Sequence, residues 1–358
     1  MNLKDRMIIE EYRKSRNNFI LLGDTVHNIL SEIVDSAGIQ ILGIEHRVKT
    51  ENSLIGKLTR VSDRYQSFIE LTDILGARVI TFFSDDVDKV GKQIEQRFKI
   101  DWENSCDKRA LIKADSFGYL SLHYICLLPE NAGYPEELCK LKFEIQIRTV
   151  LQHTWAAINH DIGYKSEFGV PRAIAREFSR VAGLLEIADD EFVRVRDNMN
   201  AYTHEIRQRI IHDTADDVPI DLISLREYVR LNKNMLAFLN ALAAINGAEI
   251  SPIPPDDYVE QLNWLHKTTL GHLQVMLEEN KELALQLAQK ALAGTDLDIL
   301  SSSVGLRFLC RAELLAKGYT QSQAAEFLTL ATGNRQRAER QAKYLFDTYK
   351  NLKGAGHD

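Results

Sequence analysis

A group of basic residues within the first sixty positions has a spacing that suits polyphosphate binding. Arg47 and Lys49 share one side of a segment that we expect to be extended. Ser53 can cap the helix that follows, on which Lys57 and Arg60 come three residues apart. Cations gathered around one helix N-terminus suit a polyphosphate. The alternative is a solvent-exposed basic helix face, which is what most runs of charge are.

Two carboxylates stand where a metal ion can bind. Asp73 comes just before the apolar run 76–83, at an expected sheet edge, which is a common place for a Mg²⁺ ligand. A helix-end or turn carboxylate is an equal alternative for this residue. In the run 142–148, apolar and polar residues alternate strictly, so that three polar side chains share one face: Glu144, Gln146 and Arg148. That face meets water or a ligand.

Further polar side chains come from the neighbouring elements. Along the expected strand 119–128, which follows Gly118, alternation places Tyr119, Ser121 and His123 on one face. The expected helix 149–165 starts directly after the polar strand and carries four residues that can be ligands or buried structural groups: His153, Trp155, Asn159 and His160. A lone histidine is usually structural, whereas a Tyr, Ser and His on one strand face are a better sign of a site.

The cationic cluster and the two carboxylates are together the parts of a metal-assisted phosphoryl-transfer site, in which catalysis is mostly positioning and charge neutralisation. The sequence contains no G-x-x-x-x-G-K-[ST] motif and no kinase glycine-rich loop, which disfavours the common nucleoside-triphosphate-binding folds.

The elements that must position these residues follow from the hydrophobic pattern. We predict a helix over 1–45, strands over 76–83, 119–128 and 142–148, a short helix over 86–98, and helices from 149 nearly to the end. Breaks are expected at 213–219 and 251–257, the second followed by one long helical pattern over 258–292. The fold class is therefore α+β: a mixed β-sheet flanked by helices over residues 1–200, followed by an all-α domain over 201–358.

Composition limits the class of protein. The chain has 358 residues, enough for two domains, and its 45% hydrophobic and 27% charged residues exclude a disordered chain. No apolar run is long enough for a membrane span, and no signal peptide is visible, so we expect a cytoplasmic protein without a membrane partner. The four cysteines form no C-x-x-C pair, which fits reduced thiols. The net charge of −7 means that any nucleic-acid surface must be local.

Five motifs, in order, resemble those of the synthetase domain of RelA/SpoT alarmone synthetases. They are Arg47-x-Lys49-x-x-x-Ser53-x-x-x-Lys57, Asp73-Ile-Leu-Gly-Ala-Arg78, Gly118-Tyr119-x-Ser121-Leu-His123-Tyr, Glu144-Ile-Gln146-Ile-Arg148-Thr and His160-x-x-x-Tyr164-Lys165. The resemblance covers roughly residues 40–170 and is greatest to the small, stand-alone synthetases, here with an added C-terminal helical domain. It implies a nucleotidyltransferase-like fold.

The resemblance also implies an activity, that of a GTP diphosphokinase: transfer of the β,γ-pyrophosphate of ATP to the 3′-hydroxyl of GDP or GTP, giving (p)ppGpp and AMP. On the ATP side it implies that Arg47 and Arg78 sandwich the adenine. The phosphates would be held by a second set: Lys49, Ser53, Lys57 and Arg60. Asp73 and Glu144 would bind Mg²⁺ as cofactor, and Glu144 would also take the proton of the 3′-hydroxyl.

The resemblance also implies roles for residues on the acceptor side. Tyr119 would stack on the acceptor base, and His123, Arg148 and Lys165 would meet its phosphates, with Gln146 and Asn159 nearby. Three positions depart from the family pattern: Leu120, His153 and Asn159. Adenine nucleotides and the terminal adenosine of tRNA therefore remain alternative acceptors. For tRNA, the local basic candidates are Arg335, Arg337, Arg340 and Lys343.

Residues 201–358 lie outside the resemblance. The segment 311–328 is faintly similar to the opening of a helix-turn-helix, but no convincing recognition helix follows it. We expect a helical hairpin used for packing, for forming a homo-oligomer or for binding an unknown protein partner, and we expect the Leu-rich face of 258–292 to pack against neighbouring helices. The rival function is a catalytically weak nucleotide-binding regulator that acts through this helical half.

Overall fold

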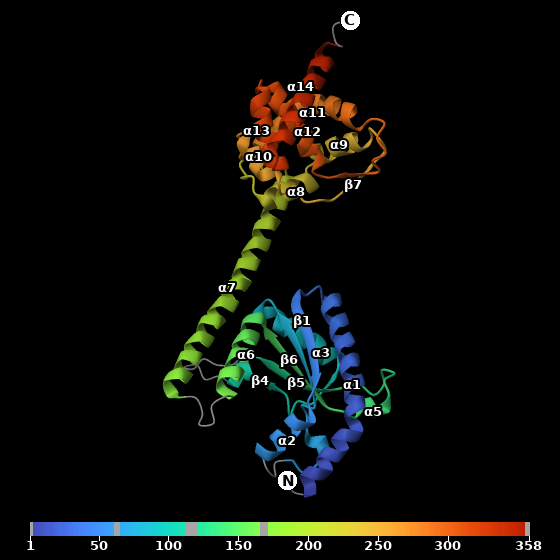
Figure 1. The fold of residues 1–358 in the computed structure, drawn as a ribbon, viewed down its shortest axis with the longest axis vertical. Coiled ribbons are helices and arrows are strands. Elements are labelled where there is room, and N and C mark those ends of the chain that lie inside the picture. Colours follow the sequence, from blue (N-terminus) through green and yellow to red (C-terminus); the bar gives the residue numbers. More distant parts are fainter. Residues whose placement is uncertain (1–2, 61–64, 112–120, 165–170, 355–358) are drawn as a thin grey trace. The chain divides into compact units, whose positions relative to one another are not determined.

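The computed structural model describes residues 3–60, 65–111, 121–164 and 171–354. The chain divides into two compact units, Met1–Arg196 and Asp197–Asp358. The boundary falls within one long helix, α7 (Arg172–Ile211), which contributes residues to both units (Figure 1).

The first unit is built on a mixed sheet, as the sequence predicts. Its strand order is β1-β2-β6-β5-β3, and β4 pairs with β5. The strands are β1 (Ile41–Val48), β2 (Leu75–Thr81), β3 (Lys99–Ile100), β4 (Cys106–Asp107), β5 (Leu122–Leu127) and β6 (Phe143–Thr149). β2 and β6 are parallel, whereas the other pairs are antiparallel. The mixed pairing follows from the helix-containing crossover between β2 and β6, since parallel strands need such a connection.

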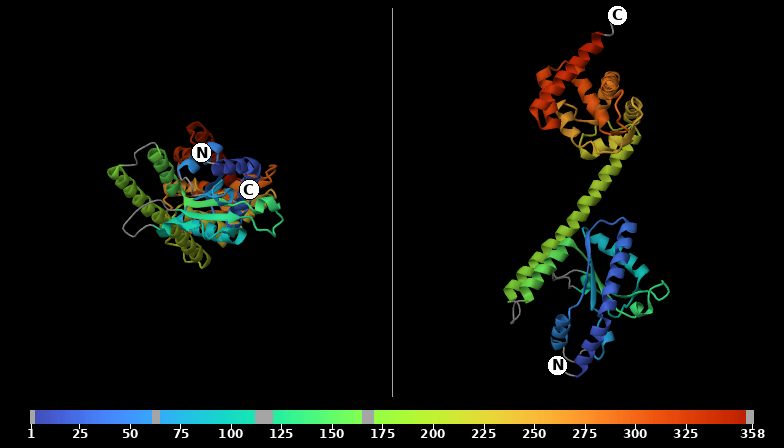
Figure 2. Two further views of the ribbon diagram at one scale, coloured as in Figure 1. Left: turned by 90° about the horizontal axis from the view of Figure 1, so that it is seen from below. Right: turned by 45° about the vertical axis from the view of Figure 1, so that its right-hand side comes forward.

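Two helices cover the apolar face of this sheet. α1 (Leu3–Ala37) runs beside β1 and β2, and α3 (Ser84–Arg97) packs on β2 and β6 (Figures 1 and 2). Five alternating strand residues are fully buried there: Ala77, Val79, Phe143, Ile145 and Ile147. The sequence pattern predicted this for the three residues of β6. The alternate residues of the same strands carry charges and amides, so the other face of the sheet is left for a ligand.

Shorter elements complete the first unit: α2 (Glu51–Arg60), the 3₁₀ turn η1 (Phe68–Glu70), α4 (Lys108–Leu111), α5 (Glu136–Cys139) and α6 (Val150–Tyr164). The strand predicted over 119–128 is described only from Leu122, and the first part of its motif, Gly118 to Leu120, lies outside the described residues.

The predicted helix over 1–45 is wrong at its end. α1 stops at Ala37, where Gly38 takes a positive φ of 62°, a conformation that glycine adopts easily and that ends many helices. The chain then forms β1, which pairs with β2 from Ile41 to Val48. Tertiary pairing here overrides a local pattern that is compatible with a helix.

The second unit is helical, with helices α8 (Leu222–Leu231), α9 (Lys233–Ala243), α10 (Tyr258–Trp264), α11 (Leu270–Leu292), α12 (Val304–Ala316), α13 (Gln321–Thr332) and α14 (Arg335–Gly354). The breaks predicted at 213–219 and 251–257 are confirmed, since α8 begins at Leu222 and α10 at Tyr258. A small addition was not predicted: β7 (Glu249–Ser251) and β8 (Ile299–Ser301) form a parallel pair.

The long helix predicted over 258–292 is instead two helices. His266 has a positive φ of 59°, and the hydroxyl of Thr269 accepts a hydrogen bond from the backbone N–H of His272, which caps the start of α11. The predicted burial of the Leu-rich face is confirmed, because Leu273, Leu277 and Leu287 lie in the core of this unit. No helix in the described ranges is long and apolar enough to cross a membrane.

Candidate active site

The basic residues of the first motif are positioned by a turn between β1 and α2. The backbone N–H of Lys49 donates to the carbonyl of Ile74 (2.7 Å), which ties the end of β1 to the start of β2. Tyr12, buried in α1, donates its hydroxyl to the carbonyl of Lys49 (2.5 Å). α2 buries Leu54 and Leu58 in the core. Lys57, which directly precedes Leu58, donates from this helix to Asp73 at 2.8 Å.

The predicted cap of this helix is one turn out of place. Thr50 directly precedes α2, and its hydroxyl accepts a hydrogen bond from the backbone N–H of Ser53 (3.3 Å) and donates to the Ser53 hydroxyl (2.9 Å). Thr50 therefore caps the helix, and Ser53 sits in its first turn, where its hydroxyl still lines the site.

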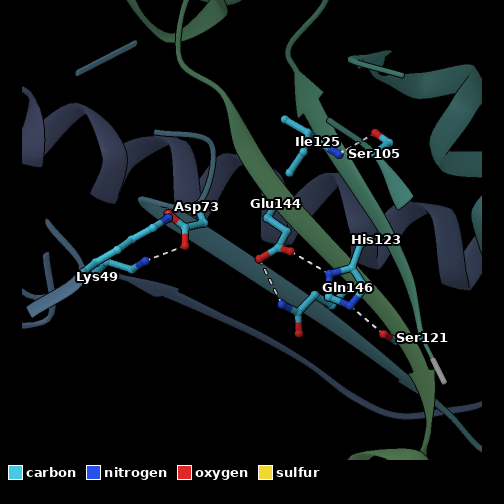
Figure 3. Close-up of polar contacts among 9 residues, drawn as sticks. Lys49, Asp73, Ser105, Ser121, His123, Ile125, Glu144 and Gln146 are labelled. Atoms are coloured by element: carbon cyan, nitrogen blue, oxygen red, sulfur yellow. Dashed lines mark hydrogen bonds and ion pairs between the residues drawn. The ribbon is translucent and has the colours of Figure 1, made fainter. Parts of the chain in front are cut away.

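Asp73 lies between two ammonium groups. Its carboxylate oxygens are 2.6 Å from Nζ of Lys49 and 2.8 Å from Nζ of Lys57 (Figure 3), and all three side chains are less than a third exposed. Burial by itself raises the pKa of Asp73, but the hydrogen bonds and charges of the two lysines outweigh it and hold the pKa below its ordinary value. Asp73 is therefore ionised at neutral pH.

Glu144 is held by a chain of hydrogen bonds from the next strand. Its Oε1 lies 2.7 Å from Nδ1 of His123, and the other ring nitrogen of His123 lies 2.5 Å from the hydroxyl of Ser121 (Figure 3). Gln146 donates to the second carboxylate oxygen at 3.0 Å. Burial raises the pKa of Glu144, but the hydrogen bond and charge of His123 outweigh it, so the pKa lies below its ordinary value.

One cavity of about 260 Å³ on the polar face of the sheet is lined by Lys49, Asp73, Glu144 and Gln146. Register explains the meeting: Gly76 of β2 pairs with Arg47 on one side and with Glu144 on the other, and Arg78 pairs with Glu45 and Gln146. No atom lies within 4 Å of the place where a Cβ on Gly76 would stand, so the glycine keeps the floor of the cavity open. The predicted site residues on its walls are Arg47, Lys49, Ser53, Asp73, Arg78, Glu144 and Gln146.

Other predicted site residues are placed differently. Arg60 does not line this cavity, and its Nε lies 3.3 Å from the carbonyl of Gly56 in its own helix. Arg148 was expected on a face that meets water or a ligand, but α6 covers the end of β6 and leaves the side chain only 4% exposed. Its guanidinium donates to Nδ1 of His153 at 3.0 Å. Burial and the charge of Arg148 lower the pKa of His153. This histidine is therefore neutral at pH 7.

The remaining acceptor-side predictions are described only in part. Asn159 lies half-buried on α6 and does not line the 260 Å³ cavity. Tyr119 and Lys165 lie outside the described residues. His123 is described: it is buried, and both of its ring nitrogens are engaged, one by Glu144 and one by Ser121.

A second cavity, of about 500 Å³, has His123 on its wall. Sequence reasoning missed most of its walls, which come from α3, the segment before β4, β4 and α4: Lys92, Glu95, Trp102, Asp107 and Arg109. Arg109 donates to both Asp107 and Asp88. The signal for these residues was weak, because Lys92 belongs to an ordinary amphipathic helix and Trp102 to a short loop. The Glu144–His123 pair thus lies between two cavities.

The donor set suits magnesium. In the described ranges no group of three or more His, Cys, Asp or Glu side chains is placed to hold a metal on its own. Asp73 and Glu144 line the same cavity, and the negative charge of Asp73 contributes to raising the pKa of Glu144. Mg²⁺ is commonly bound by one or two carboxylates together with substrate phosphates. Two carboxylates beside the cations Arg47, Lys49 and Arg78 in one cavity match that pattern.

One buried carboxyl at the end of β6 leads to a stability prediction. The hydroxyl of Thr149 donates to Asp189 of α7 at 2.8 Å, and burial raises the pKa of Asp189 from 3.8 to about 6. Between these values the unfolded chain has lost the proton while the native one keeps it. We therefore expect the free energy of unfolding to fall by on the order of 2–3 kcal/mol between pH 4 and 6 and then to level off.

Chemical denaturation across this pH range measures the effect. Asp189→Asn should flatten that part of the stability curve, whereas Glu186→Gln, at an exposed position of the same helix, should leave its slope unchanged. Equal slopes in wild type and Asp189→Asn would show that Asp189 does not titrate in this window.

Comparison with known proteins points to one family. The model described as "Region found in RelA / SpoT proteins" matches residues 46–168. GTP pyrophosphokinase YwaC of Bacillus subtilis (strain 168) is 30% identical over 159 residues, 43% of this chain and 74% of that relative. GTP pyrophosphokinase YjbM of the same organism is 29% identical over 150 residues, 42% and 69% of the two chains.

Among solved structures, a GTP pyrophosphokinase family protein from Streptococcus pneumoniae matches with a TM-score of 0.46 and 26% identity, covering 56% of this chain and 97% of that one. The described residues that line both cavities of the first unit fall within the segment that the family model matches.

Proposed function

Since this chain belongs to the RelA/SpoT family, we propose that it transfers the β,γ-pyrophosphate of ATP to the 3′-hydroxyl of GDP or GTP, releasing AMP. The relatives named above are GTP pyrophosphokinases, and their name supplies the acceptor. The observation that carries the proposal is the single cavity lined by Lys49, by Asp73, which also pairs with Lys57, and by the ionised Glu144.

The smaller cavity is the proposed ATP site. Arg47 and Arg78 stand on neighbouring strands on its polar face, where two guanidinium planes can hold an adenine between them. Lys49 and Ser53 line the end of the cavity that would bind the phosphates. Lys57 is held next to this end by its hydrogen bond to Asp73. A triphosphate that enters meets two ammonium groups already gathered by one carboxylate, so little side-chain ordering remains to be done.

The larger cavity is the proposed acceptor site. It shares His123 with the hydrogen-bond chain to Glu144, and its walls carry Lys92 together with Arg109, whose charge Asp107 and Asp88 neutralise. A nucleotide held there has its 3′-hydroxyl directed toward Glu144. Tyr119 and Lys165 keep their proposed roles in stacking on the acceptor base and in binding its phosphates.

The reaction follows from these positions. Glu144 accepts the proton of the 3′-hydroxyl as the oxygen attacks the β-phosphorus. The new bond joins the 3′-oxygen to the β-phosphorus, and the bond from that phosphorus to the α,β-bridging oxygen breaks, so AMP leaves with the electron pair. Lys49 and Lys57 neutralise the phosphate oxygens during the attack. Mg²⁺ bound by Asp73 and Glu144 would supply further charge neutralisation at the same oxygens.

His123 acts in this scheme as a positioning residue. It holds the Glu144 carboxylate and lowers its pKa, so His123→Ala should raise that pKa and move the acid limb of the pH–rate profile to higher pH. We also expect kcat to fall about tenfold to a hundredfold.

The matched variants separate positioning from packing. His123→Asn can still donate to Glu144 and should recover part of the rate, and His204→Ala, at an exposed position on α7, should leave the rate unchanged. An unshifted acid limb in His123→Ala would remove this role from the histidine.

A competition experiment tests the acceptor. Labelled ATP and Mg²⁺ are incubated with the full chain and an equimolar mixture of GDP, GTP, ADP and deacylated tRNA. The proposal predicts that the guanine nucleotides take up the label first. Labelling of tRNA or of the adenine nucleotide, with none on GDP or GTP, would overturn the acceptor while leaving the chemistry in place.

A further inference from the structure

The second unit contains a cavity of about 480 Å³ between α11, α12 and α14 that the proposed reaction does not use. Arg307 and Arg311 stand four residues apart on one face of α12. Arg337 and Arg340 stand three apart on one face of α14, with Tyr344 one turn further on. Two basic helix faces therefore border the same hollow. We call these four arginines with Tyr344 the arginine pocket.

None of the four arginines is neutralised by a carboxylate in the part of the chain that the structure describes. The polar contact of the Arg311 guanidinium is to the neutral amide of Gln341, at 3.4 Å. Burial and the nearby charge of Arg307 lower the pKa of Arg311 to about 10. Arginines elsewhere in this unit are paired: Arg226 with Asp256, and Arg207 with Glu227. The pocket thus gathers positive charge without an internal counter-charge.

Of the four basic residues in 335–343 that the sequence offered as candidates for binding tRNA, two line the pocket and two do not. Arg337 and Arg340 line the pocket, whereas Arg335 does not and pairs with Glu339 at 3.1 Å, and Lys343 also lies outside it. These four basic residues therefore form no continuous cationic track for nucleic acid, and Arg337 and Arg340 contribute their charge to the open hollow between α12 and α14. A guanidinium cluster in a hollow suits a compact anion with several oxygens, since each fork can bind a phosphate through two hydrogen bonds.

The rest of the lining is apolar or aromatic. Phe308 forms part of the wall and is buried, while the ring of Tyr344 is 61% exposed at the rim and free to stack on a planar group. A cavity of this size holds a nucleotide. We propose that the arginine pocket binds a nucleoside polyphosphate, with its phosphates on the arginines and its base against Tyr344. This site is separate from the proposed active site and does not depend on the proposed reaction.

Photolabelling of the full chain with radioactive 8-azido-ATP locates the site directly, because trypsin releases Tyr344 in a peptide, 344–350, that contains no residue of the first unit. We expect saturable labelling of this peptide. Arg311→Gln and Arg340→Gln should each lower it at least tenfold at a fixed probe concentration. Arg335→Gln, outside the pocket on the same helix, should not change it. Thermal unfolding of each variant shows that the loss is not a folding defect.

Competing ligands and calorimetry show which kind of phosphate-containing ligand the pocket binds. Unlabelled nucleoside triphosphates should protect the peptide at concentrations at least tenfold lower than inorganic tripolyphosphate, and Tyr344→Ala should remove that difference. Equal protection by tripolyphosphate would overturn the nucleotide assignment. Stronger protection by tRNA, with a loss in Arg335→Gln as well, would make the surface a nucleic-acid site. The proposal would be overturned if the peptide is not labelled and if titration with ATP or GTP gives no heat that depends on Arg311. None of these results tests the reaction proposed for the first unit.

Discussion

Glu144→Gln is expected to lower kcat for pyrophosphate transfer by about 10³-fold or more, equivalent to about 4 kcal/mol of transition-state stabilisation. The substitution keeps the size of the side chain but removes the charge that accepts the proton of the 3′-hydroxyl and that binds the metal. His123 and Gln146 can still hold the amide, so the strand and the sheet should be preserved. Release of AMP from labelled ATP measures the rate.

The matched control is Glu32→Gln, an exposed glutamate of α1 that pairs with Arg97 on the surface. Its kcat and Tm should equal those of the wild type. If Glu144→Gln keeps more than a tenth of the activity, the proton must leave by another route and Glu144 is not the base.

Asp73→Asn is expected to lower kcat to a similar extent, about 10³-fold, but it should also change how the rate depends on Mg²⁺. In the proposed mechanism the Asp73 carboxylate, whose pKa the two lysines hold low, is the second charged oxygen donor for Mg²⁺ in the cavity. Without its charge the rate should respond only weakly to added Mg²⁺. Binding of ATP in the absence of metal should persist, because Lys49 and Lys57 are no longer shared with an anion.

A magnesium titration of the rate, with calorimetric ATP binding in chelator, measures both effects. Asp35→Asn, at an exposed position near the end of α1, serves as the control and should leave both unchanged. A full Mg²⁺ response in Asp73→Asn would place the metal elsewhere.

The residues of the active site could be predicted from the sequence better than their surroundings. Strict alternation in 142–148 predicted which side chains of β6 are buried and which face the cavity, because strand geometry depends only on local periodicity. The same reasoning failed for Arg148, since its exposure depends on α6, which packs over the end of the strand. The meeting of Lys49, Lys57 and Asp73 depends on the pairing of β1 with β2, a contact that no local pattern contains.

The second cavity and the arginine pocket could not be predicted for the same reason. Arg307 and Arg311 look like ordinary surface residues of an amphipathic helix, and Arg337 and Arg340 like part of a basic run. Only the packing of α12 near α14 turns two helix faces into one lining. The helix predicted over 1–45 was too long because β1 acquires its strand conformation from a partner about thirty residues away in the chain.

The most direct test of the central claim is the identity of the nucleotide that ATP leaves behind. The full chain is incubated with Mg²⁺, GTP and ATP labelled separately at the α- and γ-phosphates, and the products are counted. Attack at the β-phosphorus predicts one AMP for each guanine nucleotide that gains the γ-label, with no ADP. Formation of ADP with the label on the acceptor or on free phosphate would show attack at the γ-phosphorus, and would contradict the assignment of this site to pyrophosphate transfer.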